Sequence, residues 1–598
     1  MTILQSLVRY YDRLPDVAKP GWSYEKFGWC IVLDAGGKPV DVENLHDTLS
    51  GKKPKVTLHA VPAALKRTVA IAPNFLWDKT AYVLGRTAGT SKRTAEEHAA
   101  FVAMHRERLA GSDDPGLLAL RRFLDTWQPD QFEALPHGGP DMLDANVMFR
   151  LEGERGYIHE RPAARALFEA KEPAGAQPGQ FCLITGEQGP VARLHPTIKG
   201  VDGAQSSGAA LVSFNLDAFT SLGKEQGENA PTSEAAAFRY GAALNQLLTR
   251  GGPNRLRRPI GDATVVFWAD ARDAKAAEAA DKLFGGWMEN EVTDEKEAEK
   301  VRAEMEQVAT GRPVADLRAD IDPATRFHVL GLSPNAARLS VRFWLTDSFD
   351  HFARALAQHY QDLRVDPLPR DWGAAPSVNR LLAKSTAAQG DVKNVPPLLA
   401  GEVMRAVLIG TRYPQSLLAT AVMRLRAGDP KTKDGKPASI GWHAAVIRAV
   451  LQRDARLSGR KDGVPMSLDE ANTDEAYRLG RLFAALEYLQ EKAIEGIKAS
   501  IRTRFLASAS AAPASVFPTL LRLSQHHIVK LSSMTGTGAA TFHDKQIQQI
   551  LEDMPPAFPR SLKLADQGRF YIGYYHQRAE RFRKRDGAPS SEEHNDGE

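Results

Sequence analysis

The sequence is poor in cysteine and contains no long apolar run. Of its 598 residues only two are cysteines, Cys30 and Cys182, which is too few for a disulfide framework. Each lies among apolar neighbours, so we expect buried thiols in a reducing compartment. No apolar run approaches the roughly 18 residues of a membrane-spanning helix, and the first residues lack a secretory-signal pattern. These absences predict a cytoplasmic protein.

Common catalytic and cofactor motifs are also missing. Gly223-Lys224 is followed by Glu and lacks the upstream glycine of a P-loop. There is no Cys-x-x-Cys, His-x-x-x-His, His-Glu-x-x-His or Gly-x-Ser-x-Gly, so the usual zinc signatures and the nucleophile elbow are absent. We therefore expect no catalysis, no cofactor and no metal. The alternative is a metal-dependent nuclease with scattered carboxylate ligands such as Asp217, Asp262 and Asp270.

Basic residues are concentrated near the C-terminus. The net charge of the whole chain is +4, yet residues 478–585 contain 17 Lys and Arg against 8 Asp and Glu. Acidic residues on both sides of this segment hide the excess. A basic segment in a nearly neutral protein is typical of a polyanion partner, although charge alone does not identify that partner.

Length and periodicity predict an α+β fold with several domains. A chain of 598 residues is too long for one hydrophobic core. Residues 1–375 are predicted to form a mixed α/β domain, 376–465 a helical connection and 466–598 an all-α helical bundle. The patterns predict strands at 29–34, 55–61, 179–185, 209–215, 263–269, 327–332 and 337–344, and helices at 95–109, 116–127, 232–248 and within 271–311.

Three polar loops are the candidate binding elements. The first, around Pro73-Asn74, contains the aromatic residues Phe75, Trp77 and Tyr82, which can either anchor the loop or stack on bases. The glycine-rich loop 198–208 lets the backbone approach a ligand closely. The third loop, 221–231, is polar and ends at a predicted helix cap. From residue chemistry alone, a purely structural role is equally possible for each loop.

Several long motifs resemble one protein family. They are Asn74-Phe-Leu-Trp-Asp-Lys-Thr-Ala-Tyr-Val-Leu-Gly85, Ser221-Leu-Gly-Lys-Glu-Gln-Gly-Glu-Asn-Ala-Pro231, Tyr477-Arg-Leu-Gly-Arg-Leu-Phe-Ala484 and Phe570-Tyr-Ile-Gly-Tyr-Tyr-His-Gln-Arg578. In this order, they are similar to the large subunit of the type I-C CRISPR Cascade complex. The resemblance extends over nearly the whole chain.

The resemblance implies a non-catalytic DNA-recognition subunit. Its partners would be the crRNA, target DNA, the handle-binding, backbone and small subunits, and a separate helicase–nuclease. The N-terminal domain would inspect the protospacer-adjacent motif (PAM) and help open the duplex, while the guide RNA reads the remaining target by base pairing. Amide side chains can read base edges, so Asn74 and Gln205 are the predicted base readers.

Phosphate contacts are predicted for Lys199, Lys224, Arg338 and Arg342. Lys79 stands where this family is expected to carry Asn, which favours a phosphate role over a base-specific one. The complete predicted PAM-contacting set is Asn74, Phe75, Lys79, Lys199, Gln205, Ser206, Lys224, Asn229, Arg338 and Arg342.

The family resemblance also implies a separate small subunit translated from within the gene. Met466 is the predicted internal start, and a helix capped by Ser467 or Asp469 would follow. Lys461-Asp462 can be encoded as AAGGA, which resembles a ribosome-binding sequence. Tyr574 and Tyr575 can stack on bases, although core packing is favoured. The predicted contacts to displaced single-stranded DNA are Arg478, Arg481, Arg502, Arg504, Arg578 and Arg581, with the cluster continuing to Arg585.

A third reading is a structural partner that contacts protein only. Neutralising phosphates gives nucleic-acid binding a steep salt dependence, so salt-insensitive binding would favour this reading.

Overall fold

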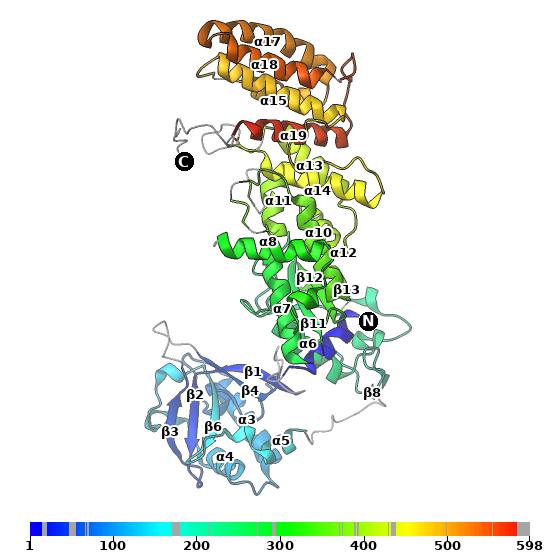
Figure 1. The fold of residues 1–598 in the computed structure, drawn as a ribbon. Helices are drawn as coiled ribbons and strands as arrows, with labels where there is room; N and C mark the ends of the chain where they lie inside the picture. The colour runs from blue at the N-terminus through cyan, green and yellow to red at the C-terminus, as the bar shows by residue number, and fades with distance from the viewer. Residues whose placement is uncertain are drawn as a thin grey trace. The chain divides into compact units, whose positions relative to one another are not determined.

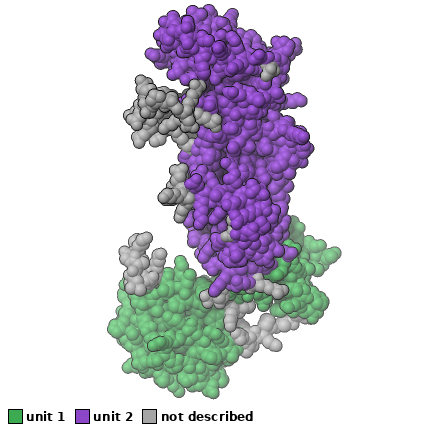
Figure 2. Space-filling view, in the orientation of Figure 1, with its two compact units in different colours: residues 1–196, 212–244 green, residues 197–211, 245–598 purple. Residues whose placement is uncertain are grey.

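The computed structural model describes residues 1–14, 21–46, 56–65, 67, 71–169, 180–214, 216–271, 273–289, 295–369, 371–373, 375–387, 390–391, 394–428, 430–431, 438–497, 499–552 and 554–582. Residue contacts divide the chain into two compact units (Figure 2). Unit 1 is Met1–Pro196 with Val212–Leu244, and unit 2 is Thr197–Leu211 with Asn245–Glu598. The predicted boundaries at 375/376 and 465/466 therefore both fall inside unit 2. Among the described residues, no helix combines the length and apolarity that crossing a bilayer requires.

The N-terminal part of unit 1 is built on a four-stranded mixed sheet in the order β3-β2-β6-β5 (Figure 1). β2 and β6 are parallel, and helix α4 packs against both. β2 alternates less than a half-buried strand would, because four of its five residues are buried. The elements of this part are α1 (Ile3–Tyr11), β1 (Trp22–Phe27), β2 (Trp29–Leu33), β3 (Pro39–Asn44), β4 (Thr57–Pro62), β5 (Asp78–Lys79), α2 (Thr80–Val83), α3 (Thr94–Leu109), α4 (Pro115–Thr126), β6 (Asn146–Leu151) and α5 (Pro162–Glu169).

Two predicted strands are much shorter than expected. In place of 179–185, of which residue 179 lies outside the described residues, the structure has β7 (Gln180–Phe181), which pairs with β8 (Gln188–Gly189). Both residues of β7 are exposed, so no core surface extends the strand. In place of 209–215 there is only β10 (Ala209–Ala210); residue 215 lies outside the described residues. Cys182, like Cys30, is buried as predicted.

Unit 2 begins with a five-stranded sheet in the order β11-β12-β13-β10-β9. β12 and β13 form a long antiparallel hairpin, and β11 is almost entirely buried. Phe267 of β11, Phe284 of α7 and Phe327 of β12 pack together, with ring centroids 4.7–6.2 Å apart. The elements are β9 (Thr197–Ile198), β10, β11 (Thr264–Asp270), α7 (Ala274–Glu289), α8 (Glu295–Ala309), α9 (Val314–Leu317), β12 (Arg326–Asn335) and β13 (Arg338–Ser348). In the sequence, α6 (Glu234–Leu247) lies between β10 and β11, and the division between the units falls within it.

The remainder of the described chain is helical, as predicted from about Leu399 onward, so the molecule has the expected α+β fold. One continuous hydrophobic core runs from Leu256 to Tyr575 and spans both predicted boundaries. The helices are α10 (Phe349–Leu363), α11 (Val378–Thr386), α12 (Pro397–Ile409), α13 (Gln415–Arg426), α14 (Gly441–Leu457), α15 (Glu475–Ala493), α16 (Ile501–Ala509), α17 (Pro513–Thr535), α18 (Thr537–Leu551) and α19 (Leu564–Ala579).

Helices α15 and α19 make the most extensive helix pair, and a glycine on each permits their close approach. A Cβ atom on Gly480 of α15 would lie 1.9 Å from Phe570 O of α19. A Cβ on Gly573 of α19 would lie 2.0 Å from Tyr477 O of α15. Neither carbonyl can move without breaking helix geometry, so both positions require glycine. This contact explains the glycines in the two C-terminal motifs.

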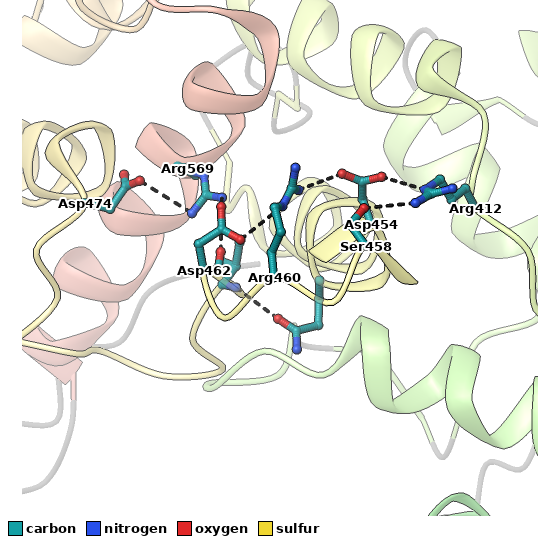
Figure 3. A network of polar contacts seen from close by, with 9 residues as sticks. Arg412, Asp454, Ser458, Arg460, Asp462, Asp474 and Arg569 are labelled. Carbon is teal, nitrogen blue, oxygen red and sulfur yellow. Dashed lines mark hydrogen bonds and ion pairs between the residues drawn. The ribbon is translucent and has the colours of Figure 1, made fainter. Parts of the chain in front are cut away.

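Ion pairs connect the long segment between α14 and α15 to α14 and to α19 (Figure 3). Arg460 pairs with Asp454 of α14 and with Asp462, and Arg569 of α19 pairs with Asp462 and Asp474. Helix α15 does not start after Ser467 or Asp469 as predicted. It starts at Glu475 and is capped by Asp474, whose Oδ1 accepts a hydrogen bond from Tyr477 N at 2.8 Å.

Candidate nucleic-acid interface

The first predicted loop turns its amide side chain into unit 1. Asn74 is 4% exposed, and its Oδ1 accepts a hydrogen bond from Leu65 N at 2.9 Å. Its own N–H donates to Asp78 Oδ2 at 2.8 Å, and Asp78 is paired with Arg67. Asn74 is thus engaged inside unit 1 in this conformation, and its base-reading role stays a prediction.

The aromatic residues of this loop serve as anchors. Phe75 stacks on His105, with 5.7 Å between the ring centroids, and the Arg108 guanidinium lies 3.7 Å from the Phe75 centroid. Burial lowers the pKa of His105 to about 4. The neutral ring accepts a hydrogen bond from Leu76 N at Nε2, at 2.8 Å. Lys79, in contrast, is exposed and available to a phosphate.

The third predicted loop presents a leucine to solvent. Ser221 and Lys224 bridge around the two-residue turn Leu222-Gly223, and Lys224 N donates to Ser221 O at 3.0 Å. Leu222 is 93% exposed, more than any other exposed large hydrophobic side chain among the described residues. Its φ of 53° lies in the left-handed region, which costs a residue with a Cβ roughly 1–2 kcal/mol.

Asn229 holds this turn in place. Its Oδ1 accepts a hydrogen bond from Ser221 N at 3.0 Å, and its Nδ2 donates to Lys224 O at 3.2 Å and to Gln226 O at 3.0 Å. The amide of Asn229 therefore positions the loop, whereas the Lys224 side chain is exposed.

The glycine-rich loop belongs to unit 2 and exposes its polar side chains. Lys199, Gln205 and Ser206 are all exposed. Within the described ranges, neither Gln205 nor Ser206 makes a side-chain hydrogen bond, so both amide and hydroxyl groups are available to a ligand. The backbone is fixed: Gly208 N donates to Gln205 O at 2.9 Å, and Lys199 N to Asn245 Oδ1 at 2.7 Å.

The two predicted arginines of β13 differ in exposure. Arg342 is exposed but forms an ion pair with Asp262, with 3.2 Å between Nε and Oδ1. Arg338 is half-buried and lies opposite Ala210 of β10. The Asp262 carboxylate offsets the charge that Arg342 can offer to a phosphate.

A comparison with known protein families identifies the family of this chain. Residues 7–582 match the family described as CRISPR-associated protein (Cas_Csd1). The chain belongs to this family. The match covers nearly the whole sequence and agrees with the resemblance to the type I-C large subunit. In a comparison with curated proteins, none matches.

The C-terminal helices of this CRISPR-associated protein bury most of the arginines predicted to contact single-stranded DNA. Arg504 is exposed, whereas the others are buried or half-buried. Tyr574 and Tyr575 are buried, which confirms the core-packing reading. The buried and half-buried guanidinium groups donate to acceptors within the fold: Arg478 to Asn472 O, Arg481 to Glu470 O and Gln577 Oε1, Arg502 to Ala438 O, Arg578 to Tyr574 Oη, and Arg581 to Glu491. Residues 583–585 lie outside the described residues.

Sequence reasoning missed exposed basic side chains on α17. Arg522, His526 and Lys530 are exposed and recur every four residues along one side of the helix. The spacing of four residues is the sequence signal for this row.

Of the carboxylates named for the nuclease alternative, Asp217 belongs to unit 1, and Asp262 and Asp270 belong to unit 2. Asp262 is paired with Arg342. Within the part of the chain that the structure describes, no group of three or more His, Cys, Asp or Glu side chains is arranged to hold a metal ion.

Proposed function

We propose that the chain is the large subunit of a type I-C CRISPR Cascade complex that recognises the PAM in double-stranded DNA. It promotes duplex opening and R-loop formation, helps to recruit the helicase–nuclease, and performs no chemistry itself. Family membership over residues 7–582 supports the CRISPR assignment. The partners follow from that role: crRNA, target DNA and the other Cascade subunits.

The observation that carries the opening step is the conformation of the turn Ser221–Lys224. Leu222 is almost fully exposed in a strained backbone conformation, and Asn229 fixes the base of the turn. Proteins that unstack DNA insert apolar side chains between base steps. A rigidly held leucine beside the exposed Lys224 has the chemistry of such a wedge, with a cation available to an adjacent phosphate.

The exposed side chains of the predicted PAM set, apart from Arg342 with its ion-pair partner Asp262, are the preferred DNA contacts. In unit 1 these are Lys79 and Lys224, and in unit 2 they are Lys199, Gln205 and Ser206. Gln205 can both donate to and accept from a base edge, and the lysines contribute sequence-independent phosphate contacts.

Duplex opening by the reconstituted crRNA complex tests the wedge. We expect Leu222→Gly to slow the opening of an intact PAM-containing duplex, measured with 2-aminopurine beside the PAM, by roughly tenfold, equivalent to about 1.4 kcal/mol of activation free energy. Binding to a duplex with a preformed bubble should be unchanged. Leu194→Ala, which truncates another exposed leucine, is the control. Equal opening rates for wild type and Leu222→Gly would refute the wedge.

Three further assays test the rest of the proposal. Gln205→Ala should reduce the preference for PAM-containing over scrambled DNA. Purified protein supplied with Mg²⁺ or Mn²⁺ should leave DNA intact, and cleavage would instead support the nuclease alternative. Changing the Met466 codon to a non-start codon should abolish a short C-terminal product; its persistence would contradict the internal start.

A further inference from the structure

A cavity of about 390 Å³ lies among the C-terminal helices, between α15, α18 and α19. Ala484 and Ala485 of α15 line it. Both are buried, and their methyl side chains leave the space that larger residues would fill. The volume falls within the roughly 300–1,000 Å³ of sites that bind small ligands.

Aromatic rings form two sides of this cavity. Phe542 of α18 lines it and is 47% exposed. Tyr488 of α15 is held between neighbours: the Arg581 guanidinium lies 4.4 Å from its ring centroid, and the His543 ring meets it edge-on at 4.9 Å. A flat ligand would therefore meet one exposed ring and one ring whose orientation is fixed.

Two amide side chains add hydrogen-bonding groups. Gln577 of α19 is 4% exposed, and its Oε1 accepts a hydrogen bond from Arg481 Nε at 3.0 Å. This leaves the Nε2 hydrogens for another acceptor. Gln546 of α18 lines the cavity as well and carries both a donor and an acceptor. Donor and acceptor atoms beside an aromatic ring match the edge and face of a nucleobase.

The charges favour a base over a phosphate inside the cavity. Arg581 is ion-paired with Glu491 at 2.7 Å and with Glu487 at 3.6 Å, so its charge is offset. Glu580 also lines the cavity and repels anions. Exposed cations lie outside: the Lys492 Nζ is 5.6 Å from the Tyr488 centroid, and Lys545 neighbours Gln546 on α18.

We propose that this cavity binds one extruded nucleobase of single-stranded DNA. The base stacks on Phe542, the amides of Gln546 and Gln577 contact its edge, and the flanking phosphates lie near Lys492 and Lys545. The inference rests on the proposed function to the extent that displaced single-stranded DNA must reach these helices. It adds a base-binding step to what would otherwise be binding through phosphates alone.

Binding of the full chain to matched oligonucleotides tests this proposal. Fluorescence anisotropy compares a single-stranded oligonucleotide with an abasic strand of the same length. Stacking contributes about 1–3 kcal/mol per base, so we expect wild type to prefer the natural strand by roughly 5- to 150-fold. Phe542→Ala should lose most of that preference while retaining the affinity for the abasic strand, and Gln546→Ala should lose part of it.

Matched control variants distinguish an effect of the cavity from an effect of other exposed side chains nearby. Phe582→Ala removes another exposed aromatic ring. Gln549→Ala removes an exposed amide on α18, the helix that carries Gln546. Both variants should bind like wild type. Equal binding of natural and abasic strands, or unchanged preference in Phe542→Ala and Gln546→Ala, would overturn the base cavity and leave phosphate binding in place. No binding of either strand by wild type would overturn both the cavity and the single-stranded-DNA role on which it rests.

Discussion

Two loops of unit 1 that each contain a key asparagine orient their side chains in opposite directions. The loop around Asn74 packs its aromatic rings and its amide inward, whereas the turn at Leu222 presents an apolar side chain to solvent. The first loop has aromatic residues whose burial is favourable, and the amide beside them then needs an internal partner. The second lacks aromatic residues, and its amide, Asn229, is used to brace the turn. Polar composition alone therefore does not identify a binding surface.

The largest expected effect comes from removing the carboxylate of Asp78, which holds the loop around Asn74 inside unit 1. Asp78 is 1% exposed, pairs with Arg67 and accepts the N–H of Asn74. Asp78→Ala leaves a part-buried guanidinium without its partner, so we expect the free energy of unfolding of unit 1 to fall by about 3–5 kcal/mol. Chemical denaturation measures this change. Asp217→Ala, at an exposed carboxylate, should change it little, and an equal loss in both variants would contradict the comparison.

The next effect is a dependence of the free energy of unfolding on pH, caused by His105. Its folded-state pKa of about 4 lies below the ordinary value of 6.5, so the unfolded chain binds the proton first as pH falls. Stability from this residue is complete above pH 6.5 and is lost as pH falls from 6.5 towards 4, by up to about 3 kcal/mol. We expect His105→Gln to reduce the slope of unfolding free energy against pH in this range. An unchanged slope in this variant would contradict the role given to His105.

A smaller effect distinguishes the two possible roles of Asn74. Removing its amide in Asn74→Ala takes away the acceptor for Leu65 N, and we expect a stability loss of about 1–2 kcal/mol. The same variant is assayed for PAM preference. Lost stability with unchanged preference assigns a structural role. Retained stability with lost preference would establish Asn74 as a base reader and remove the contrast between the loops.

The smallest effect has the opposite sign. Leu222→Asn places a residue that tolerates the left-handed region in the turn, so we expect stability to rise by about 0.5–1 kcal/mol, measured by thermal unfolding. Duplex opening should decline in the same variant. A rise in stability together with unimpaired opening would show that the strained leucine has no part in DNA recognition.

Regular elements were predicted well from the sequence. Strands β2, β11, β12 and β13 and helices α3 and α4 appear close to the predicted positions, because each has a clear apolar pattern and a long partner surface. The predicted strands at 179–185 and 209–215 shrink to two residues each: both residues of β7 are exposed, and β10 pairs with β13 through Ala210 alone. Pattern shows that a strand is possible, but pairing decides its length.

The candidate site was less predictable because side-chain direction depends on tertiary packing. Arg478 and Arg481 look like surface cations in the sequence, yet both donate to carbonyl groups of the connection before α15. The strain at Leu222 has no sequence signal, since leucine is not a residue of left-handed turns. The cavity beside Phe542 brings together three helices separated by up to about ninety residues, which local pattern does not reveal.

The paired glycines of α15 and α19 have a consequence for any product that begins at Met466. Both Gly480 and Gly573 lie downstream of that methionine, so such a product retains the whole interlock of its first and last helices. It lacks Asp462, however, so that Arg569 keeps only Asp474 as a partner. The side of α19 that packs on α13 and α14 in the full chain would then be open to a different neighbour.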